Sequence, residues 1–152
     1  RDVAVTGVQT CALPILKKIL VIHMFVMLVV EREMSYRSAL EAAGAEVLWF
    51  KEFGNYSGIW FAKVRYNGEE GWIKDWFGSC TVCDQFQAEF DSCYDSEELP
   101  EDYQERLANF GKSYLGGILP AEHYLPALDE DAEYDQDAEE AAAWIRKIEG
   151  IE

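Results

Sequence analysis

Two cysteines separated by two residues, Cys80 and Cys83, are the part of the sequence with the most evident chemistry. Thiolates at this spacing can bind one zinc ion, and Cys93 with His123 would complete a tetrahedral set. Real zinc modules usually contain two such pairs, so a single pair also fits ordinary loop or buried thiols. Zinc held by Cys80, Cys83, Cys93 and His123 is therefore the alternative to our expectation that no cofactor is bound.

The same pair could instead be redox-active, because a thioredoxin-like site places its cysteines where a strand leads into a helix. Asp84 follows Cys83 directly and is a favourable helix N-cap. Against this, the preceding strands have the pattern of an antiparallel hairpin, and acidic surroundings raise a thiol pKa. With Cys11 set aside, the number of cysteines is odd and no convincing secretion signal is present. Reduced thiols in a bacterial cytoplasm are therefore expected.

The sequence does not identify a catalytic residue. Nucleophilic attack by Cys80 or Cys83 would need a general base, and His123 is the one histidine after residue 33. The chain has no phosphate-binding loop, dinucleotide-binding glycine motif, serine-hydrolase elbow or HExxH zinc motif. Among so many acidic residues no carboxylate pair stands out. The sequence therefore favours a protein that is not an enzyme.

An Asn67-Gly68 dipeptide separates two β-rich runs, residues 59–66 and 69–77. Asn-Gly favours a type I′ turn, because both central residues need positive φ. This turn sets Tyr66 opposite Glu69, Arg65 opposite Glu70, Lys63 opposite Trp72 and Phe61 opposite Lys74. One face of the predicted hairpin then carries the better core candidates, which are Trp60, Ala62, Val64, Ile73 and Phe77.

The other face of the hairpin combines aromatic rings with basic side chains. Its apolar residues are Ile59, Phe61, Trp72 and Trp76, and they alternate with Lys63, Arg65 and Lys74. Such a surface could stack a nucleotide-like ligand; the contacts would come from Phe61, Lys63, Trp72, Lys74 and Trp76. The alternative is a sheet covered by helices on both sides, with lysine stems lying over the rings.

The chain is strongly acidic, with 29 acidic and 13 basic residues and a net charge of −16. Acidic residues concentrate between Glu89 and Glu140. An acidic surface aids solubility, and a concentrated one can also bind a basic protein. The predicted partner-binding acidic face consists of Asp95, Glu97, Glu98, Asp129, Glu130 and Asp131. The same charge repels nucleic acid and anionic membranes, so neither is an expected partner.

Helix signals flank the predicted hairpin. Ser35 can cap a short helix that stops at Gly44, and a strand follows over 47–53. Further helices are predicted from Asp84 to about Phe90, over 101–115 and over 136–149. The prolines in 118–128 predict irregular packing there, with an acidic turn over 129–135. Together these elements predict an α+β domain: an antiparallel sheet of about three strands with a central Asn-Gly hairpin, flanked by about four helices.

The N-terminal segment 1–33 is expected to lie outside this domain, which would span 34–152. Residues 1–16 have no helix or strand period and resemble the translated read-through of a sequencing adapter. The apolar run 19–30 is shorter than the roughly 20 residues of a membrane span and has no cleavage site after it. Glu31-Arg32-Glu33 can be encoded by purines alone, like a ribosome-binding site before Met34. Residues 17–33 are therefore expected to be a translated leader.

The stretches Tyr66–Ile73 and Trp76–Ala88 resemble a family of small, acidic, uncharacterised proteins from bacteriophages and gut metagenomes. The resemblance rests on a Gly-Ser-Cys loop, 78–80, followed by Cys83 and Asp84. It extends through 107–115, 118–120 and the last helix. It implies a phage or prophage accessory protein and brings no established activity. Together with the charge, it predicts a module that binds a basic host protein, including in an anti-defence role.

Overall fold

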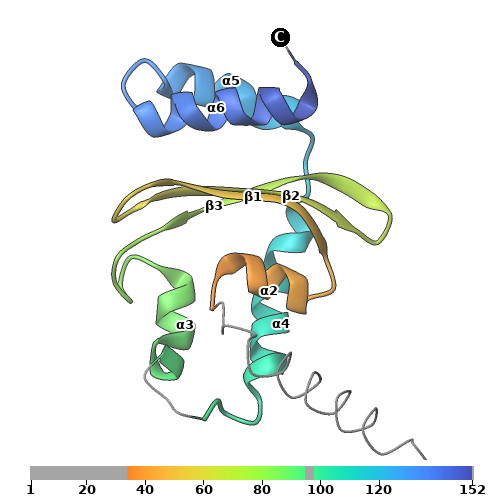
Figure 1. Ribbon diagram of the computed structural model, residues 1–152, viewed down its shortest axis with the longest axis vertical. Helices are drawn as coiled ribbons and strands as arrows, with labels where there is room; N and C mark the ends of the chain where they lie inside the picture. Colours follow the sequence, from red (N-terminus) through yellow and green to blue (C-terminus); the bar gives the residue numbers. More distant parts are fainter. Residues whose placement is uncertain (1–33, 95–97, 152) are drawn as a thin grey trace, which may run out of the picture. The chain divides into compact units, whose positions relative to one another are not determined.

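Three antiparallel strands form the centre of the fold, in the order β1-β2-β3. The computed structural model describes residues 34–94 and 98–151, so the expectations for 1–33, Asp95 and Glu97 lie outside the described residues. The strands are β1 (Glu46–Gly54), β2 (Gly58–Tyr66) and β3 (Glu69–Phe77). Figure 1 shows helices on both sides of this sheet. The predicted α+β class is confirmed.

The β2–β3 hairpin has the predicted turn and register. Asn67 and Gly68 have φ values of 51° and 86°, the positive values that a type I′ turn requires. All four predicted cross-strand pairs are present, from Tyr66 opposite Glu69 to Phe61 opposite Lys74. Because side chains alternate along a strand, this register decides which residues face each helical layer.

The central strand β2 is buried on both of its faces. Trp60, Ala62 and Val64 point into one core, and Ile59 and Phe61 point into the other. Trp60 is fully buried, although its indole N–H has no hydrogen-bond partner among the described residues. Helices cover the sheet on both sides (Figure 1). This agrees with the predicted alternative of a covered sheet and not with an open stacking surface.

One face of the sheet packs against three helices. These are α2 (Tyr36–Ala42), α3 (Gln85–Tyr94) and α4 (Tyr103–Tyr114). α2 begins at the predicted cap Ser35, whose hydroxyl oxygen accepts a hydrogen bond from the Ser38 amide. α2 and α4 cross closely at Gly111, where a Cβ atom would overlap the backbone carbonyl of Ala39. A glycine is therefore needed inside α4 despite its low helix propensity.

The other face packs against α5 (Ala121–Asp131) and α6 (Gln136–Glu149). α6 has the predicted bounds, with Asp135 as its side-chain N-cap and Gly150 in the left-handed conformation after its last turn. Within the described residues, none of the helices combines the length and apolar character that crossing a bilayer requires.

The expectation of irregular packing over 118–128 is wrong, because α5 occupies most of it. Pro120 lies at the N-cap of α5, where no amide donor is needed, and Pro126 lies inside the helix. An interior proline costs about 3 kcal/mol of helix stability. Burial of Tyr124, Leu125 and Leu128 against the sheet offsets this cost. Residues 129–131, predicted as part of a turn, extend the same helix.

The chain passes from one helical layer to the other at the β3 edge. A short 3₁₀ turn, Leu115–Gly117, follows α4. Trp72 and Leu119 then exchange two backbone hydrogen bonds, of 2.7 and 2.9 Å. Gly71 leaves room for this passage, since a Cβ atom there would lie 2.8 Å from the carbonyl oxygen of Leu119. The crossing also covers part of a sheet edge that would otherwise expose backbone groups.

Gly111→Ala is expected to lower the free energy of unfolding by about 2 kcal/mol, the usual cost of an overpacked core. The new methyl group would push α4 away from the Ala39 carbonyl. Urea denaturation measures the effect. Gly116→Ala is the matched control, because nothing lies within 4 Å of its Cβ position. An equal loss in both variants would contradict a specific contact between α2 and α4.

Candidate functional site

The loop between β3 and α3 contains the Cys80-x-x-Cys83 motif. The amide of Cys83 donates to the carbonyl of Cys80 at 2.9 Å, and the amide of Asp84 donates to the same oxygen at 3.0 Å. Cys80 and Cys83 are exposed and are joined by a disulfide. The structure therefore differs from the expectation of reduced thiols at this pair.

Asp84 holds this loop against two helices. Its side chain is 5% exposed and accepts hydrogen bonds from the amide of Gly78 at 2.9 Å and the amide of Gln87 at 2.8 Å. The hydroxyl of Tyr36 donates to it at 3.2 Å. The bond to Gln87 is the predicted N-cap of α3. The contacts with Gly78 and Tyr36 tie the same carboxylate to the end of β3 and to α2.

A small pocket lies beside Asp84, between α2, the sheet and the start of α3. Its volume is about 160 Å³, similar to a cavity of about 150 Å³ that accommodates one benzene ring. We call it the acidic pocket. Its lining residues are Met34, Ser35, Tyr36, Glu52, Phe77, Gly78, Asp84, Phe86 and Gln87.

Glu52 lines the acidic pocket from β1 and is itself exposed to solvent. It pairs with Trp60 on β2, and opposed residues of an antiparallel pair share a face. Partial desolvation raises the pKa of Glu52, and the nearby Asp84 carboxylate raises it further. None of the lining residues is basic. The pocket therefore contains negative charge that its own walls do not neutralise.

Two tyrosines near the pocket are held in their neutral form. Burial is the main cause that raises the pKa of Tyr36, and the carboxylates Asp84 and Asp75 add to it. Burial followed by Asp75 raises the pKa of Tyr114 in the same way. Both hydroxyls therefore remain hydrogen-bond donors at neutral pH and do not add to the negative charge.

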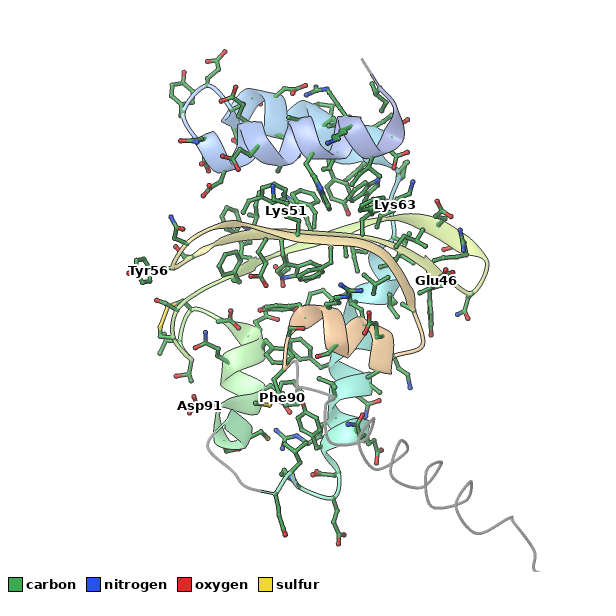
Figure 2. All side chains as sticks on the ribbon, in the orientation of Figure 1. Glu46, Lys51, Tyr56, Lys63, Phe90 and Asp91 are labelled. Carbon is green, nitrogen blue, oxygen red and sulfur yellow. A yellow bond between two sulfur atoms is a disulfide. The ribbon has the colours of Figure 1, made fainter. Side chains whose placement is uncertain are left out.

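The predicted ligand-stacking residues lie on the side of the sheet that α5 and α6 cover. Phe61 is fully buried, and Trp72 is 1% exposed. Lys63, on this side in Figure 2, forms ion pairs with Glu149 and Glu70. Stacking of a ligand on these rings would require α6 to move away.

The remaining two residues of the predicted stacking surface lie towards the edge of the sheet. The Lys74 ammonium is 5.9 Å from the centre of the Phe61 ring. Trp76 is 65% exposed. Trp76 is therefore open to solvent, whereas Phe61 and Trp72 are covered. The five side chains do not form one open surface for stacking.

The predicted zinc ligands are not brought together. Cys93 is fully buried near the far end of α3, about 12 Å along the helix axis from its start at the helical rise of 1.5 Å per residue. His123 is exposed on α5, across the sheet. Cys80 and Cys83 bond to each other. Within the described residues, no group of three His, Cys, Asp or Glu side chains is placed to hold a metal ion.

The described residues of the predicted acidic face lie in two places. Glu98 precedes α4, whereas Asp129, Glu130 and Asp131 end α5 on the other side of the sheet (Figure 1). Asp129 pairs with Arg146 at 2.6 Å. These four residues therefore do not form one continuous face.

Sequence reasoning did not identify Glu52 or Tyr36 as site residues. Asp84 was expected only as a helix cap. Glu52 precedes the core residue Phe53 on a strand, so its side chain lies on the opposite face. This pattern does not distinguish a residue in solvent from a residue that lines a pocket. The long-range contact between Tyr36 and Asp84 has no signal in the local sequence.

Comparison of the chain with protein-family models, with curated proteins and with solved structures found no match.

Asp84→Ala is expected to lower the free energy of unfolding by about 2–3 kcal/mol, since a helix cap and two further hydrogen bonds are lost. Asp84→Asn keeps an acceptor and should lose less. Urea denaturation gives both values. Asp91→Ala, an exposed change on the same helix, is the control and should stay within about 0.5 kcal/mol. Equal effects at 84 and 91 would contradict the role of Asp84 in holding the loop.

Proposed function

We propose that the protein is an interaction module that binds a basic protein and receives one of its lysine or arginine side chains in the acidic pocket. The observation that carries this proposal is a pocket lined by the carboxylates of Glu52 and Asp84 and by no basic residue. A carboxylate whose charge is disfavoured in the free protein gains most from a cation that arrives with a partner.

The chemistry of the pocket walls fits an alkylammonium or guanidinium group. Tyr36, Phe77 and Phe86 supply aromatic surface, which attracts cations and covers an aliphatic stem. Asp84 already accepts three hydrogen bonds from the protein, so Glu52 is the carboxylate with capacity for a direct contact. Asp84 would contribute mainly through its charge.

The charge outside the pocket supports the same class of partner. A net charge of −16 accelerates encounter with a basic protein and disfavours acidic competitors. Glu130 and Asp131 at the end of α5 are exposed and would act in this long-range way. The resemblance to bacteriophage proteins makes a host protein the expected partner, with anti-defence as one such role.

Peptide binding tests the proposal. A short peptide that alternates lysine with glycine should bind the full chain in isothermal titration calorimetry, and its glutamine analogue should not. Glu52→Gln is expected to weaken binding about tenfold to hundredfold, because one charge-assisted hydrogen bond is worth about 1.5–3 kcal/mol.

The matched control is Glu130→Gln, which removes the same charge from an exposed position far from the pocket. It should weaken binding less than threefold at moderate salt, because Glu130 does not line the pocket and its interaction with a peptide held there is screened over that distance. If both variants lose affinity equally, the peptide binds through net charge and the pocket proposal fails.

Thermal stability of Glu52→Gln gives a second test that needs no partner. A raised native-state pKa means that the folded protein binds the Glu52 proton more tightly than the unfolded chain. Stability therefore falls as pH rises through that pKa. Glu52→Gln should melt at a higher temperature than the parent at pH 7, and the difference should vanish below the ordinary glutamate pKa of about 4.3. A lower melting temperature at pH 7 would contradict the unneutralised charge.

A further inference from the structure

We propose that the Cys80–Cys83 disulfide is a thiol–disulfide exchange site, which reacts with a thiol of another molecule. This proposal is independent of the acidic-pocket function. Both cysteines are exposed, on a loop that leads from β3 into α3. Between them, Val82 is 95% exposed, so an attacking molecule meets an open apolar contact beside the sulfur atoms.

Stabilisation of the fold does not explain this disulfide well. Loop-closure entropy predicts about 2 kcal/mol for a ring of four residues, against about 3 kcal/mol for a 15-residue loop. The residues that it joins are already connected by the hydrogen bond from the Cys83 amide to the Cys80 carbonyl, and the Asp84 amide donates to the same oxygen. A short ring constrains the unfolded chain less than a long one, so this cross-link contributes less stability than a disulfide that closes a long loop.

The same contacts keep the two sulfur atoms near each other after reduction. Asp84 binds the amide of Gly78, before the pair, and the amide of Gln87, after it. The side-chain amide of Gln87 also donates to the Gly78 carbonyl at 3.0 Å. A Cβ atom on Gly78 would lie 2.7 Å from that of Cys83. A loop preorganised in this way loses little entropy when the disulfide re-forms.

The Cys80–Cys83 pair can also react without interference from Cys93. Cys93 is the remaining cysteine of the described residues, and it is fully buried in the core beside α2 and α4. A buried thiol does not compete for a mixed disulfide. An external thiol that reacts with Cys80 or Cys83 therefore meets the other member of the pair as its resolving group.

The exchange balances as a two-electron reaction. An external thiolate attacks one sulfur of the pair, the Cys80–Cys83 bond breaks, and the leaving sulfur takes a proton from solvent. A second external thiolate then attacks the mixed disulfide and releases the other cysteine, which is also protonated. The external molecule is oxidised to a disulfide, and the protein gains two electrons and two protons. The reverse sequence re-forms the protein disulfide.

The test is equilibration of the folded full chain with mixtures of reduced and oxidised glutathione, followed by acid quenching, alkylation and mass mapping. Cys11 is replaced by serine in every sample, so that the mapped thiols are Cys80, Cys83 and Cys93. A synthetic peptide of residues 78–87 provides the reference for an unfolded loop. We expect the folded protein to exchange without denaturant and to favour ring closure at least about tenfold over the peptide, the equivalent of one or two hydrogen bonds.

Tyr36→Phe should move the thiol–disulfide equilibrium constant towards that of the peptide, and Asp84→Ala should move it further. Circular dichroism verifies that both variants are folded. Cys93→Ser should leave the equilibrium constant unchanged. A disulfide that glutathione reduces only after urea is added would show a purely structural bond and overturn the proposal. Equal equilibrium constants for protein and peptide would also overturn it, because the fold would then contribute nothing to exchange.

Discussion

The burial of β2 on both faces is the constraint on which the rest of the structure depends. Three strands cannot close on themselves, and alternation along β2 sends Trp60 and Phe61 to opposite sides. Both sides must then be covered. Since α4 and α5 lie on different sides, the chain has to cross a sheet edge, and it does so at Leu119. The gain from burying these rings outweighs the cost of an indole N–H of Trp60 that has no partner among the described residues, about 1–3 kcal/mol.

The parts of the fold that the sequence predicts are those with strong local rules. Asn67-Gly68 determines one turn type, and that turn determines the whole β2–β3 register. The last helix has an N-terminal acidic cap and a C-terminal glycine, so its bounds are predicted as observed. α5 was missed because Pro126 is a local signal against a helix, whereas the burial that stabilises α5 is a tertiary effect.

The candidate site was less predictable because it also depends on tertiary contacts. Its side chains come from α2, β1, β3 and α3, which are brought together by the sheet. The cysteine spacing was compatible with zinc binding or redox chemistry, and the choice depends on where Cys93 and His123 lie after folding. Cys93 follows the helical period of α3 into the core. The arrangement in space thus separates Cys93 and His123 from the cysteine pair, whereas spacing alone is compatible with all four as ligands of one metal ion.

Asp84 connects the acidic pocket with the disulfide loop. Gly78 and Asp84 both line the pocket, and the bond between them also holds the loop in place. Even a small adjustment of Asp84 on reduction, with its hydrogen bonds kept, would move a charge in the pocket wall. Thermodynamic linkage then requires reciprocity: if reduction changes the affinity for a cation by some factor, the cation changes the exchange equilibrium by the same factor. A buried carboxylate shared by two sites is sufficient for such coupling, and the size of the coupling depends on how far Asp84 moves.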